Sequence, residues 1–253
     1  MQPHIKVKNV PAKVLLMGDP KRVGLVGSFL EKFNIIAKNR EFRLGVGIYK
    51  GKEILACSAG IGCPSTAIAV EELINAGAKT IIRIGTCGGA WRSDISAGSL
   101  IIPTSSIRDE GASLEYIPQG FPAVADIDVT NALMASADKL KFKKFVGINR
   151  THDAFYGSQK TITKWGLYLA EKRWQKSDTP ILSSEMECSI LFVIASLRNV
   201  KAGAILAVNS NPEPLKERVA NKKLLVITES NEKVTRKTVE KMIKVALEAM
   251  TVL

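Results

Sequence analysis

Short apolar runs alternate with amphipathic stretches along most of the chain. Four runs are typical of buried strands because they are short, almost wholly apolar and bounded by glycine or polar residues. They span residues 13–17, 80–84, 99–103 and 203–209. Between and after them, apolar residues recur at helical spacing. These stretches predict helices over residues 22–33, 63–77, 130–140, 186–197 and 232–250.

Two further segments predict a hairpin and a loop-rich connection in addition to these strands and helices. Residues 44–49 and 53–58 flank Lys50-Gly51-Lys52 and predict a β-hairpin. Residues 107–128 are punctuated by proline and predict a loop-rich connection. No repeat or composition break divides the chain, so we expect a single α/β domain over residues 1–253, with a central mixed sheet covered by helices. Ligands of such sheets bind at the carboxyl ends of the strands.

Composition narrows the class of protein. The chain has 253 residues, of which 46% are hydrophobic and 24% charged, as in ordinary globular proteins. No apolar run is long enough for a membrane span, and the N-terminal residues do not resemble a secretory signal. The four cysteines form no metal-binding pair and predict no disulfide framework, so we expect a cytoplasmic protein.

The net charge of +12 has three possible origins: nucleic-acid binding, an anionic substrate, or a solvated lysine surface. The basic residues are scattered, and their densest clusters contain little aromatic character. We therefore expect no nucleic-acid partner, although a basic RNA- or DNA-binding protein remains the non-enzymatic alternative.

Three short motifs follow or precede apolar runs and carry candidate chemistry. Gly18 and Arg22 flank the turn after the first run, where backbone N–H groups and a guanidinium suit phosphate; an ordinary strand-to-helix turn is the alternative. Arg83 lies inside an apolar run that ends at Thr86, and a buried arginine needs an anion or a carboxylate partner. The sequence lacks the glycine fingerprints of dinucleotide and nucleoside triphosphate sites.

The third motif is Glu185-Met186-Glu187, directly before a strongly apolar helix. Carboxylates at this position are common as partners of the helix dipole. Two carboxylates are also suitable acceptors for the vicinal hydroxyls of a ribose. The motif alone does not decide between these interpretations.

The order of the motifs along the chain resembles the hexameric nucleoside phosphorylases, that is, uridine phosphorylases and bacterial and protozoan purine nucleoside phosphorylases. The resemblance covers nearly the whole chain from His4 to the last helix. It rests on Gly18-Asp19-Pro20 with Arg22, Asn39-Arg40-Glu41-Phe42, Gly60-Ile61-Gly62-Cys63-Pro64-Ser65, Val70-Glu71-Glu72-Leu73, Arg83-Ile84-Gly85-Thr86-Cys87-Gly88, Phe121-Pro122-Ala123-Val124-Ala125-Asp126 and Glu185-Met186-Glu187.

This resemblance implies a pentosyltransferase in which phosphate attacks C1′ of a nucleoside and releases a free base and ribose 1-phosphate. No cofactor is required, because inorganic phosphate is the co-substrate. The implied phosphate ligands are Gly18, Arg22, Arg40, Arg83 and Thr86. The implied ribose ligands are His4, Glu185, Met186 and Glu187, and Arg83 and Glu187 carry the catalytic roles.

The resemblance also implies a homo-hexamer built as a trimer of dimers. Arg40 and His4 match residues that complete the site of a neighbouring subunit. A monovalent cation, potassium, is implied at the dimer interface by Glu41, Ile61 and Ser65; hydrogen bonding of these groups to one another is the alternative.

The base-binding positions favour the uridine branch of the family. Phe155, Gln159 and Asn209 match its base-binding residues. Thr161 and Ser210, however, stand where that branch has arginines, and the Asp that protonates purines is absent after the last strand. We expect uridine as the substrate, with slower cleavage than the family's best. A purine nucleoside phosphorylase and a nucleosidase that uses water are the alternatives.

Overall fold

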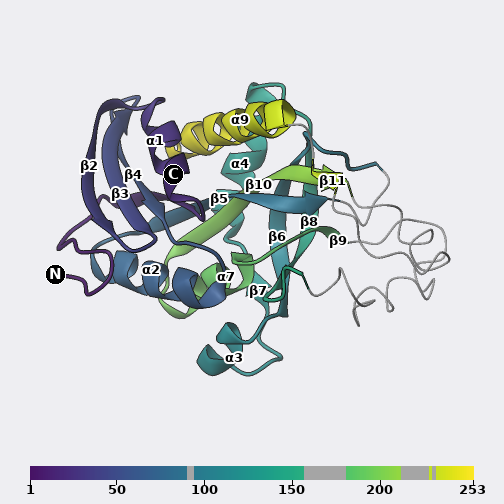
Figure 1. Cartoon of the computed structure of the whole chain (residues 1–253), viewed down its shortest axis with the longest axis horizontal. Helices are drawn as coiled ribbons and strands as arrows, with labels where there is room; N and C mark the ends of the chain where they lie inside the picture. The colour runs from purple at the N-terminus through teal and green to yellow at the C-terminus, as the bar shows by residue number, and fades with distance from the viewer. Residues whose placement is uncertain (90–93, 157–180, 212–227, 230–231) are drawn as a thin grey trace.

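The apolar runs form strands of one mixed sheet, and helices cover both of its faces (Figure 1). The computed structural model describes residues 1–89, 94–156, 181–211, 228–229 and 232–253. Within these residues the strands are β1 (Lys13–Met17), β2 (Glu31–Asn39), β3 (Phe42–Tyr49), β4 (Lys52–Ser58), β5 (Thr80–Gly89), β6 (Leu100–Asp109), β7 (Ala123–Val124), β8 (Lys144–His152), β9 (Ile181–Glu185), β10 (Lys201–Asn211) and β11 (Thr228–Glu229). The helices are α1 (Pro20–Gly27), α2 (Cys63–Asn75), α3 (Ala112–Tyr116), α4 (Ile127–Lys139), α7 (Cys188–Leu197) and α9 (Glu232–Met250).

The sheet closes on itself at one end. Its strand order is β11-β10-β6-β8-β9-β5-β1-β4-β3-β2, with β7 on β6, and β10 also pairs with β5. The β5–β10, β10–β6, β6–β8, β8–β9 and β9–β5 pairings therefore form a closed ring of strands. Neighbouring strands run parallel in the series β4-β1-β5-β10. Their carboxyl ends point in the same direction, and four of the five expected phosphate ligands lie on or directly after β1 and β5: Gly18, Arg22, Arg83 and Thr86.

Alternating side chains of the central strands pack on the two faces of the sheet. In β1, Val14 and Leu16 belong to a core beneath α2 and α7, whereas Leu15 and Met17 belong to a core beneath α1, α4 and α9. This two-sided burial explains the uninterrupted apolar runs in the sequence. Among the described helices, none combines the length and apolar character that a membrane span requires.

The helix predicted over residues 22–33 is wrong in its second half. Helix α1 ends at Gly27, and the chain then enters the edge strand β2, which the sequence analysis did not predict. The ring of Phe33 explains the early end: a Cβ on Gly27 would lie 2.4 Å from it, and one on Gly45 would lie 2.2 Å from it. Phe33 therefore packs against two glycines as a strand residue.

Two further boundaries differ from the sequence prediction. Ser183, Ser184 and Glu185 end strand β9 instead of opening a helix, and α7 begins only at Cys188. The segment 107–128, predicted as loop-rich, contains the end of β6 together with α3 and β7. The prediction of a hairpin over residues 44–58 is confirmed by β3 and β4.

Glu248 connects the last helix to the rest of the fold. Its carboxylate in α9 accepts a hydrogen bond from Lys50 Nζ at 2.6 Å, in the β3–β4 turn, and pairs with Lys139 at the end of α4. The hydrogen bonds from Lys139 and Lys50 lower the pKa of Glu248 to about 2. The carboxylate is buried, whereas both lysines are largely exposed.

We expect the contribution of Glu248 to stability to depend on pH. A glutamate in the unfolded chain has a pKa of about 4.3, so the depressed pKa stabilises the fold above that value, and the stabilisation is lost as the pH falls through about 2. The Glu248→Gln variant should unfold at a lower urea concentration than the wild type at pH 7, and the two should converge in strong acid.

The control is Glu240→Gln, which removes the same charge from a more exposed position on the same helix, 3.5 Å from Arg236. Exposed pairs of this kind contribute little to stability. Equal urea midpoints for both variants at pH 7 would contradict the role given to Glu248.

Candidate active site

A buried ion cluster joins β5 to the segment between β9 and α7. Arg83 Nε donates to Glu185 Oε2 at 3.0 Å, and Arg83 Nη2 donates to Glu187 Oε2. All three side chains are buried, with 5% exposure or less for each residue. The structure therefore confirms that Arg83 has carboxylate partners, and both come from the motif that the sequence analysis singled out.

Gly85 makes room for the guanidinium of Arg83. Residues 83 and 85 lie on the same face of β5, and a Cβ on Gly85 would be only 2.8 Å from Arg83 Nη2 and 3.1 Å from Leu206 Cδ2. A side chain at position 85 would therefore displace Arg83 from its partners. The functional importance of this glycine was missed in the sequence, where it was visible only as part of a glycine-rich strand end.

The two carboxylates are held in different ways. Glu187 accepts from the backbone N–H of Gly62 at 2.7 Å in addition to Arg83. Glu185 accepts from Asn149 Nδ2 at 2.9 Å, from Thr151 Oγ1 at 2.6 Å, and from backbone N–H groups at the start of α7. Hydrogen-bond donors thus surround Glu185 far more completely than Glu187.

These surroundings shift the pKa values of the pair in opposite directions. Burial alone would raise the pKa of Glu185, but Arg83 and the hydrogen bonds from Thr151, Glu187 N and Asn149 hold it below its ordinary value. Burial raises the pKa of Glu187, and the charge of Glu185 adds to the rise although Arg83 opposes it. Glu185 is therefore the more readily ionised member of the pair.

Three of the four other expected phosphate ligands lie at the same edge of the sheet: Gly18, Arg22 and Thr86. Arg22, in the first turn of α1, donates through Nη1 to the carbonyl of Ile84 at 3.2 Å, and burial and Arg83 lower its pKa. The backbone of Gly18 faces that of Gly60, whose N–H donates to the Gly18 carbonyl at 3.1 Å. A Cβ on Gly18 would meet Gly60 O at 3.0 Å. Thr86 follows on β5 and is half-buried.

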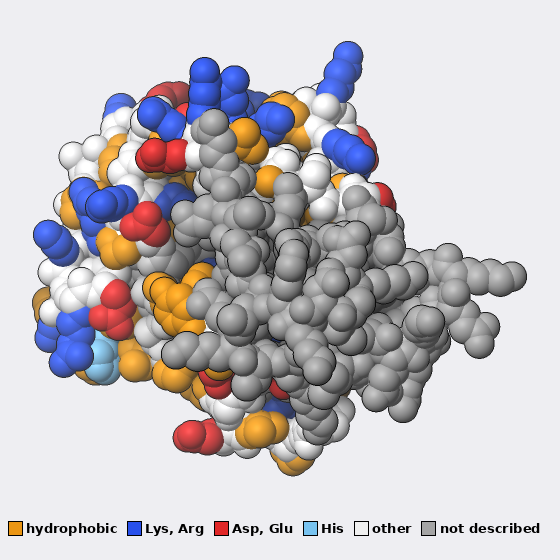
Figure 2. Space-filling view, turned by 45° about the vertical axis from the view of Figure 1, so that its right-hand side comes forward, with side chains coloured by type: hydrophobic (Ala, Val, Ile, Leu, Met, Phe, Trp, Pro, Cys, Tyr) orange, Lys and Arg blue, Asp and Glu red, His pale blue; other side chains and the backbone are white. Residues whose placement is uncertain are grey.

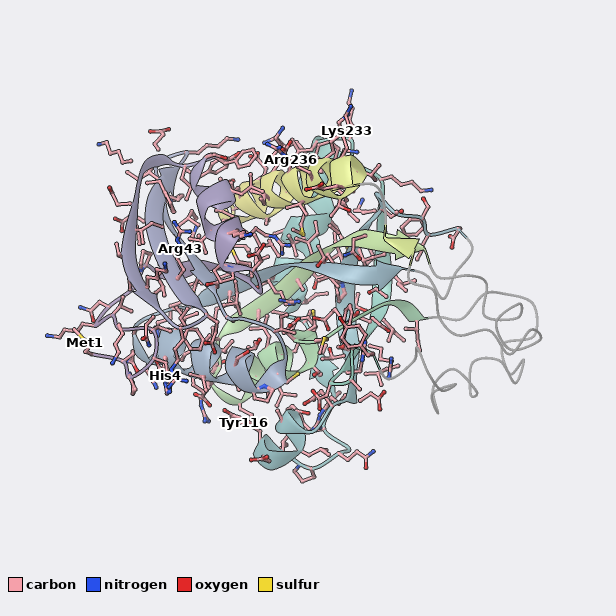
Figure 3. The ribbon with its side chains drawn as sticks, viewed as in Figure 1. Met1, His4, Arg43, Tyr116, Lys233 and Arg236 are labelled. Atoms are coloured by element: carbon pink, nitrogen blue, oxygen red, sulfur yellow. The ribbon has the colours of Figure 1, made fainter. Side chains whose placement is uncertain are left out.

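His4 and Arg40 lie apart from this cluster. His4 contacts Glu72 of α2, with Nδ1 2.6 Å from Oε1, and its carbonyl accepts from Asn39, the neighbour of Arg40. Glu72 is nine residues beyond Cys63, so it lies about 13 Å along the helix from the end that faces Glu187. Figure 3 shows His4 at the outer edge of the molecule, near Met1. Arg40 is exposed in the β2–β3 turn with a φ of +52°.

The expected base-binding residues are only partly described. Phe155 is 51% exposed after β8, and its ring meets Tyr156 edge-on with centroids 4.9 Å apart. Asn209 is half-buried at the end of β10, where the β10–β5 register shifts between Val208 and Ser210. Such a bulge re-aims a side chain at the rim of a site. Gln159 and Thr161 lie outside the described residues.

The residues of the expected cation site do lie together. Ser65 Oγ donates to the carbonyl of Ile61 at 3.1 Å and to that of Gly62 at 3.2 Å. A Cβ on Gly60 would be 2.9 Å from Glu41 Cγ and 3.4 Å from Ser65 Oγ. The Ser65 hydroxyl and the Ile61 carbonyl are therefore bonded to each other, as the alternative to a cation site predicts, and the Glu41 side chain packs beside the same glycine.

Cysteine thiols near the cluster are not activated. Cys63 donates through Sγ to the carbonyl of Met186 at 3.2 Å, and Cys188 begins α7. Burial raises the pKa of the Cys63, Cys87 and Cys188 thiols. They remain protonated at neutral pH, so they act here as packing groups and not as nucleophiles.

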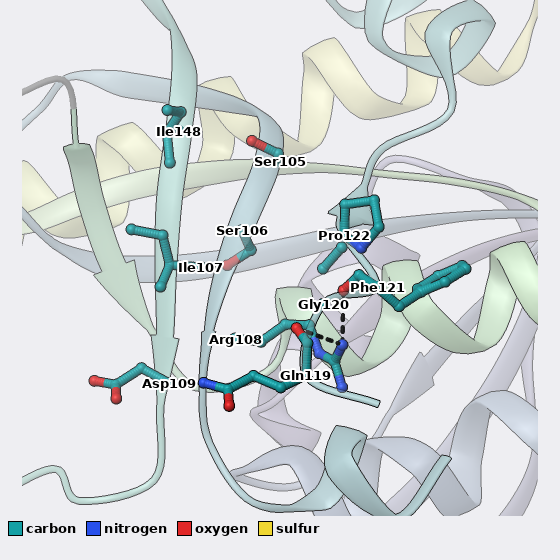
Figure 4. A pocket seen from close by; sticks show the side chains of 11 residues that line it. Ser105, Ser106, Ile107, Arg108, Asp109, Gln119, Gly120, Phe121, Pro122 and Ile148 are labelled. Carbon is teal, nitrogen blue, oxygen red and sulfur yellow. Dashed lines mark hydrogen bonds between the residues drawn. The ribbon is translucent and has the colours of Figure 1, made fainter. Parts of the chain in front are cut away.

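A separate pocket of about 670 Å³ opens between β6 and the segment before β7 (Figure 4). Arg108 shapes this segment by donating to the carbonyl of Phe121 at 2.6 Å. The residues that line the pocket include Ser106, whose hydroxyl points into the hydrogen-bond network around Glu185. None of the expected phosphate, ribose or base residues is among those residues.

Replacing Arg83 should destabilise the fold as well as the site. The Arg83→Met variant leaves two buried carboxylates without their cation, and breaking a buried pair in this way costs about 3–5 kcal/mol. Urea denaturation at pH 7 measures the loss. Arg22→Met is the matched control, because Arg22 is only half-buried and donates to a neutral carbonyl. A loss in Arg83→Met no larger than in Arg22→Met would contradict this account.

Comparison with known proteins identifies the family of this chain. The profile of the Phosphorylase superfamily matches residues 13–251. A uridine phosphorylase from Thermococcus kodakarensis is 40% identical over 216 residues, which cover 83% of this chain and 78% of that protein. The crystal structure of uridine phosphorylase from Vibrio fischeri ES114 superposes with a TM-score of 0.82 at 32% identity, over 100% of this chain and 98% of that one. Purine nucleoside phosphorylase from Toxoplasma gondii, in complex with immucillin-H, superposes with a TM-score of 0.85 at 31% identity, over 98% and 94% of the two chains. The chain belongs to the Phosphorylase superfamily.

Proposed function

We propose that this protein cleaves uridine by phosphorolysis, releasing uracil and ribose 1-phosphate. The observation that carries the proposal is the position of Arg83, which is buried on β5 between Glu185, at the end of β9, and Glu187, and is close to Arg22. Membership of the Phosphorylase superfamily and the uridine phosphorylases among its relatives support the same activity.

The cluster is suited to position an anionic nucleophile against a sugar. Arg83 and Arg22 supply guanidinium groups beside the Gly18 turn, and a guanidinium fork matches phosphate oxygens. Phosphate is already a nucleophile, so catalysis requires orientation and charge control more than a general base. The carboxylate of Glu187 provides acceptors for ribose hydroxyls and a negative charge near the oxocarbenium-like transition state.

The base would be bound and recognised by Phe155, Gln159 and Asn209. The bulge at the end of β10 places Asn209 beside Cys87 and Gly88 near the end of β5, whereas Arg83 pairs with Ala204, five residues earlier on β10. Purine cleavage is the second candidate, and the superposition on a purine nucleoside phosphorylase favours it. The lack of an aspartate after β10 weighs against it, because purine departure requires protonation.

The proposed assembly is a hexamer of three dimers, in the cytoplasm, with sites shared between neighbours. The His4 carbonyl accepts a hydrogen bond from Asn39, the neighbour of Arg40. His4 also contacts Glu72, which is far along α2 from the helix end that faces Glu187 of the same chain. A surface that carries two site residues away from their own site is suited to complete the site of a second copy. Glu41, Ile61 and Ser65 would hold a potassium ion at this interface, where it would neutralise the Glu41 carboxylate.

A panel of nucleosides tests the reaction and the base together. Uridine, inosine, guanosine and adenosine are incubated with and without phosphate, and free base and ribose 1-phosphate are measured by chromatography. Uridine should be cleaved fastest, and only with phosphate. Equal rates without phosphate would overturn phosphorolysis in favour of a nucleosidase, and faster cleavage of a purine nucleoside would overturn the choice of uridine.

Mixing two inactive variants tests the shared site. Arg40→Ala and Glu187→Gln should each be impaired, the first mainly through a higher KM for phosphate. After co-refolding, random pairing in a symmetric dimer should restore about one quarter of the sites, each with Glu187 from one chain and Arg40 from the other. The control is Lys38→Ala, an exposed residue of the adjoining strand β2, which should keep full activity. No recovery in the mixture would show that each chain completes its own site.

A further inference from the structure

A buried network of polar side chains behind Glu185 has no counterpart among the expected site residues. It comprises Ser106 of β6, Asn149 and Thr151 of β8, Ser183 of β9 and Ser189 of α7, and all five are 5% exposed or less. Buried polar groups are costly unless they are hydrogen-bonded. A network of this size in the core therefore needs a purpose that apolar residues could not serve.

The ionised carboxylate of Glu185 fixes the direction of every hydrogen bond in this network. A carboxylate only accepts, so Asn149 must present its amide nitrogen to Oε1, at 2.9 Å. The amide oxygen of Asn149 then accepts from Ser183 Oγ at 2.8 Å. The same nitrogen donates to Ser106 Oγ at 2.9 Å.

Thr151 connects Ser106 to Glu185 in this hydrogen-bond network. Its only proton goes to Glu185 Oε1 at 2.6 Å, so Ser106 must donate to Thr151 Oγ1, at 2.7 Å. The backbone N–H of Ser189 also donates to Thr151 Oγ1, at 3.0 Å. Asn149 therefore donates to Ser106, Ser106 donates to Thr151, and Thr151 donates to Glu185. Asn149 also donates to Glu185 directly.

Glu185 has no unused acceptor capacity in this arrangement. Two carboxylate oxygens offer about four lone-pair positions. Five groups donate to them: Arg83 Nε, Asn149 Nδ2, Thr151 Oγ1 and the backbone N–H groups of residues 187 and 188. A ribose hydroxyl would have to displace one of these donors, so the geometry favours Glu185 as a support for Arg83 over Glu185 as a ligand of the sugar.

We propose that Asn149 is a positioning residue of the active site, which acts through Glu185 to hold the guanidinium of Arg83 in the orientation that binds phosphate. The inference rests on the proposed function for its kinetic consequences, but its binding consequence does not depend on turnover. Glu187 has a further donor of its own in the Gly62 N–H, so we expect the sugar side of the site to depend less on Asn149 than the phosphate side does.

The Asn149→Asp variant tests this proposal because it preserves shape and removes a donor. When ionised, the introduced carboxylate cannot donate and repels Glu185, so Arg83 loses its fixed partner. When protonated, the introduced carboxyl group donates an O–H to Oε1 and restores the contact. We expect kcat/KM for phosphate to fall by about tenfold or more at pH 8, since a charge-assisted bond is lost, and to recover as the pH is lowered. KM for the nucleoside should change little.

The matched control is Asn34→Asp, which adds the same charge on the exposed edge strand β2. Its pH profile should follow the wild type. A flat ratio of Asn149→Asp to wild-type activity across the pH range would overturn the proposal. A loss that does not recover in acid, with both KM values raised together, would also overturn it, because that pattern indicates general disruption of the core.

Thr151 provides a second test if Asn149→Asp does not fold. Thr151→Ser keeps the hydroxyl that donates to Glu185, whereas Thr151→Val removes it with nearly the same volume. Thr151→Val should raise KM for phosphate, whereas Thr151→Ser should keep the wild-type KM; equal values for the two variants would overturn the proposal.

If the wild type shows no phosphorolysis, the proposed function fails separately, and calorimetric titration with inorganic phosphate at pH 8 still compares wild type with Asn149→Asp. Equal phosphate affinity would then overturn the inference.

Discussion

Burial of one arginine between two glutamates is the constraint on which the rest of this structure depends. A charge removed from water is tolerated only when its partners are placed with accuracy, because the desolvation cost of each ion is several kcal/mol. Arg83 lies on β5, and its partners Glu185 and Glu187 lie more than one hundred residues later. The fold must therefore bring β5, β9 and the start of α7 into one fixed relation, and the absent side chain at Gly85 leaves the necessary room.

The surroundings of the cluster give its two carboxylates different roles. Donors from β8 and α7 saturate Glu185 and keep it ionised, so it serves as a rigid counter-charge. Glu187 has fewer partners and a raised pKa, so it remains the more adaptable group. Figure 2 shows basic side chains in separate groups on the left and upper parts of the described surface, with acidic side chains between them. Among the arginines of the proposed site, Arg83 is buried and Arg22 is half-buried, whereas Arg40 is exposed.

Much of the fold followed from hydrophobic periodicity. The runs at residues 13–17 and 80–84 are continuous because both faces of β1 and β5 are covered, and α9 matches its predicted range of 232–250. Strand β2 escaped prediction because its pattern is that of an exposed edge, and only the packing of Phe33 on Gly27 and Gly45 reveals why the chain extends there. Likewise, β9 is too short to be separated from the apolar helix that follows it. In the site, an anion or carboxylate partner for Arg83 was anticipated from residue types, but its identification as Glu185 and Glu187 was not. The support from Asn149 and Thr151 was not anticipated either, because hydrogen bonds across neighbouring strands leave no periodic trace in the sequence.

The closed ring of strands has a consequence for how the chain reaches its native state. β5 pairs with β1 through contacts available early in the chain, but its other neighbours, β9 and β10, are made about one hundred residues later. Contacts between segments so distant in sequence slow folding, because the entropy of closing a long loop must be overcome before they form. During synthesis, β5 would leave the ribosome with one edge unpaired and Arg83 without its carboxylates. Strand β10 seals most of this edge and β9, which carries Glu185, seals its last residues, so ring closure and assembly of the ion cluster both belong to the late part of folding.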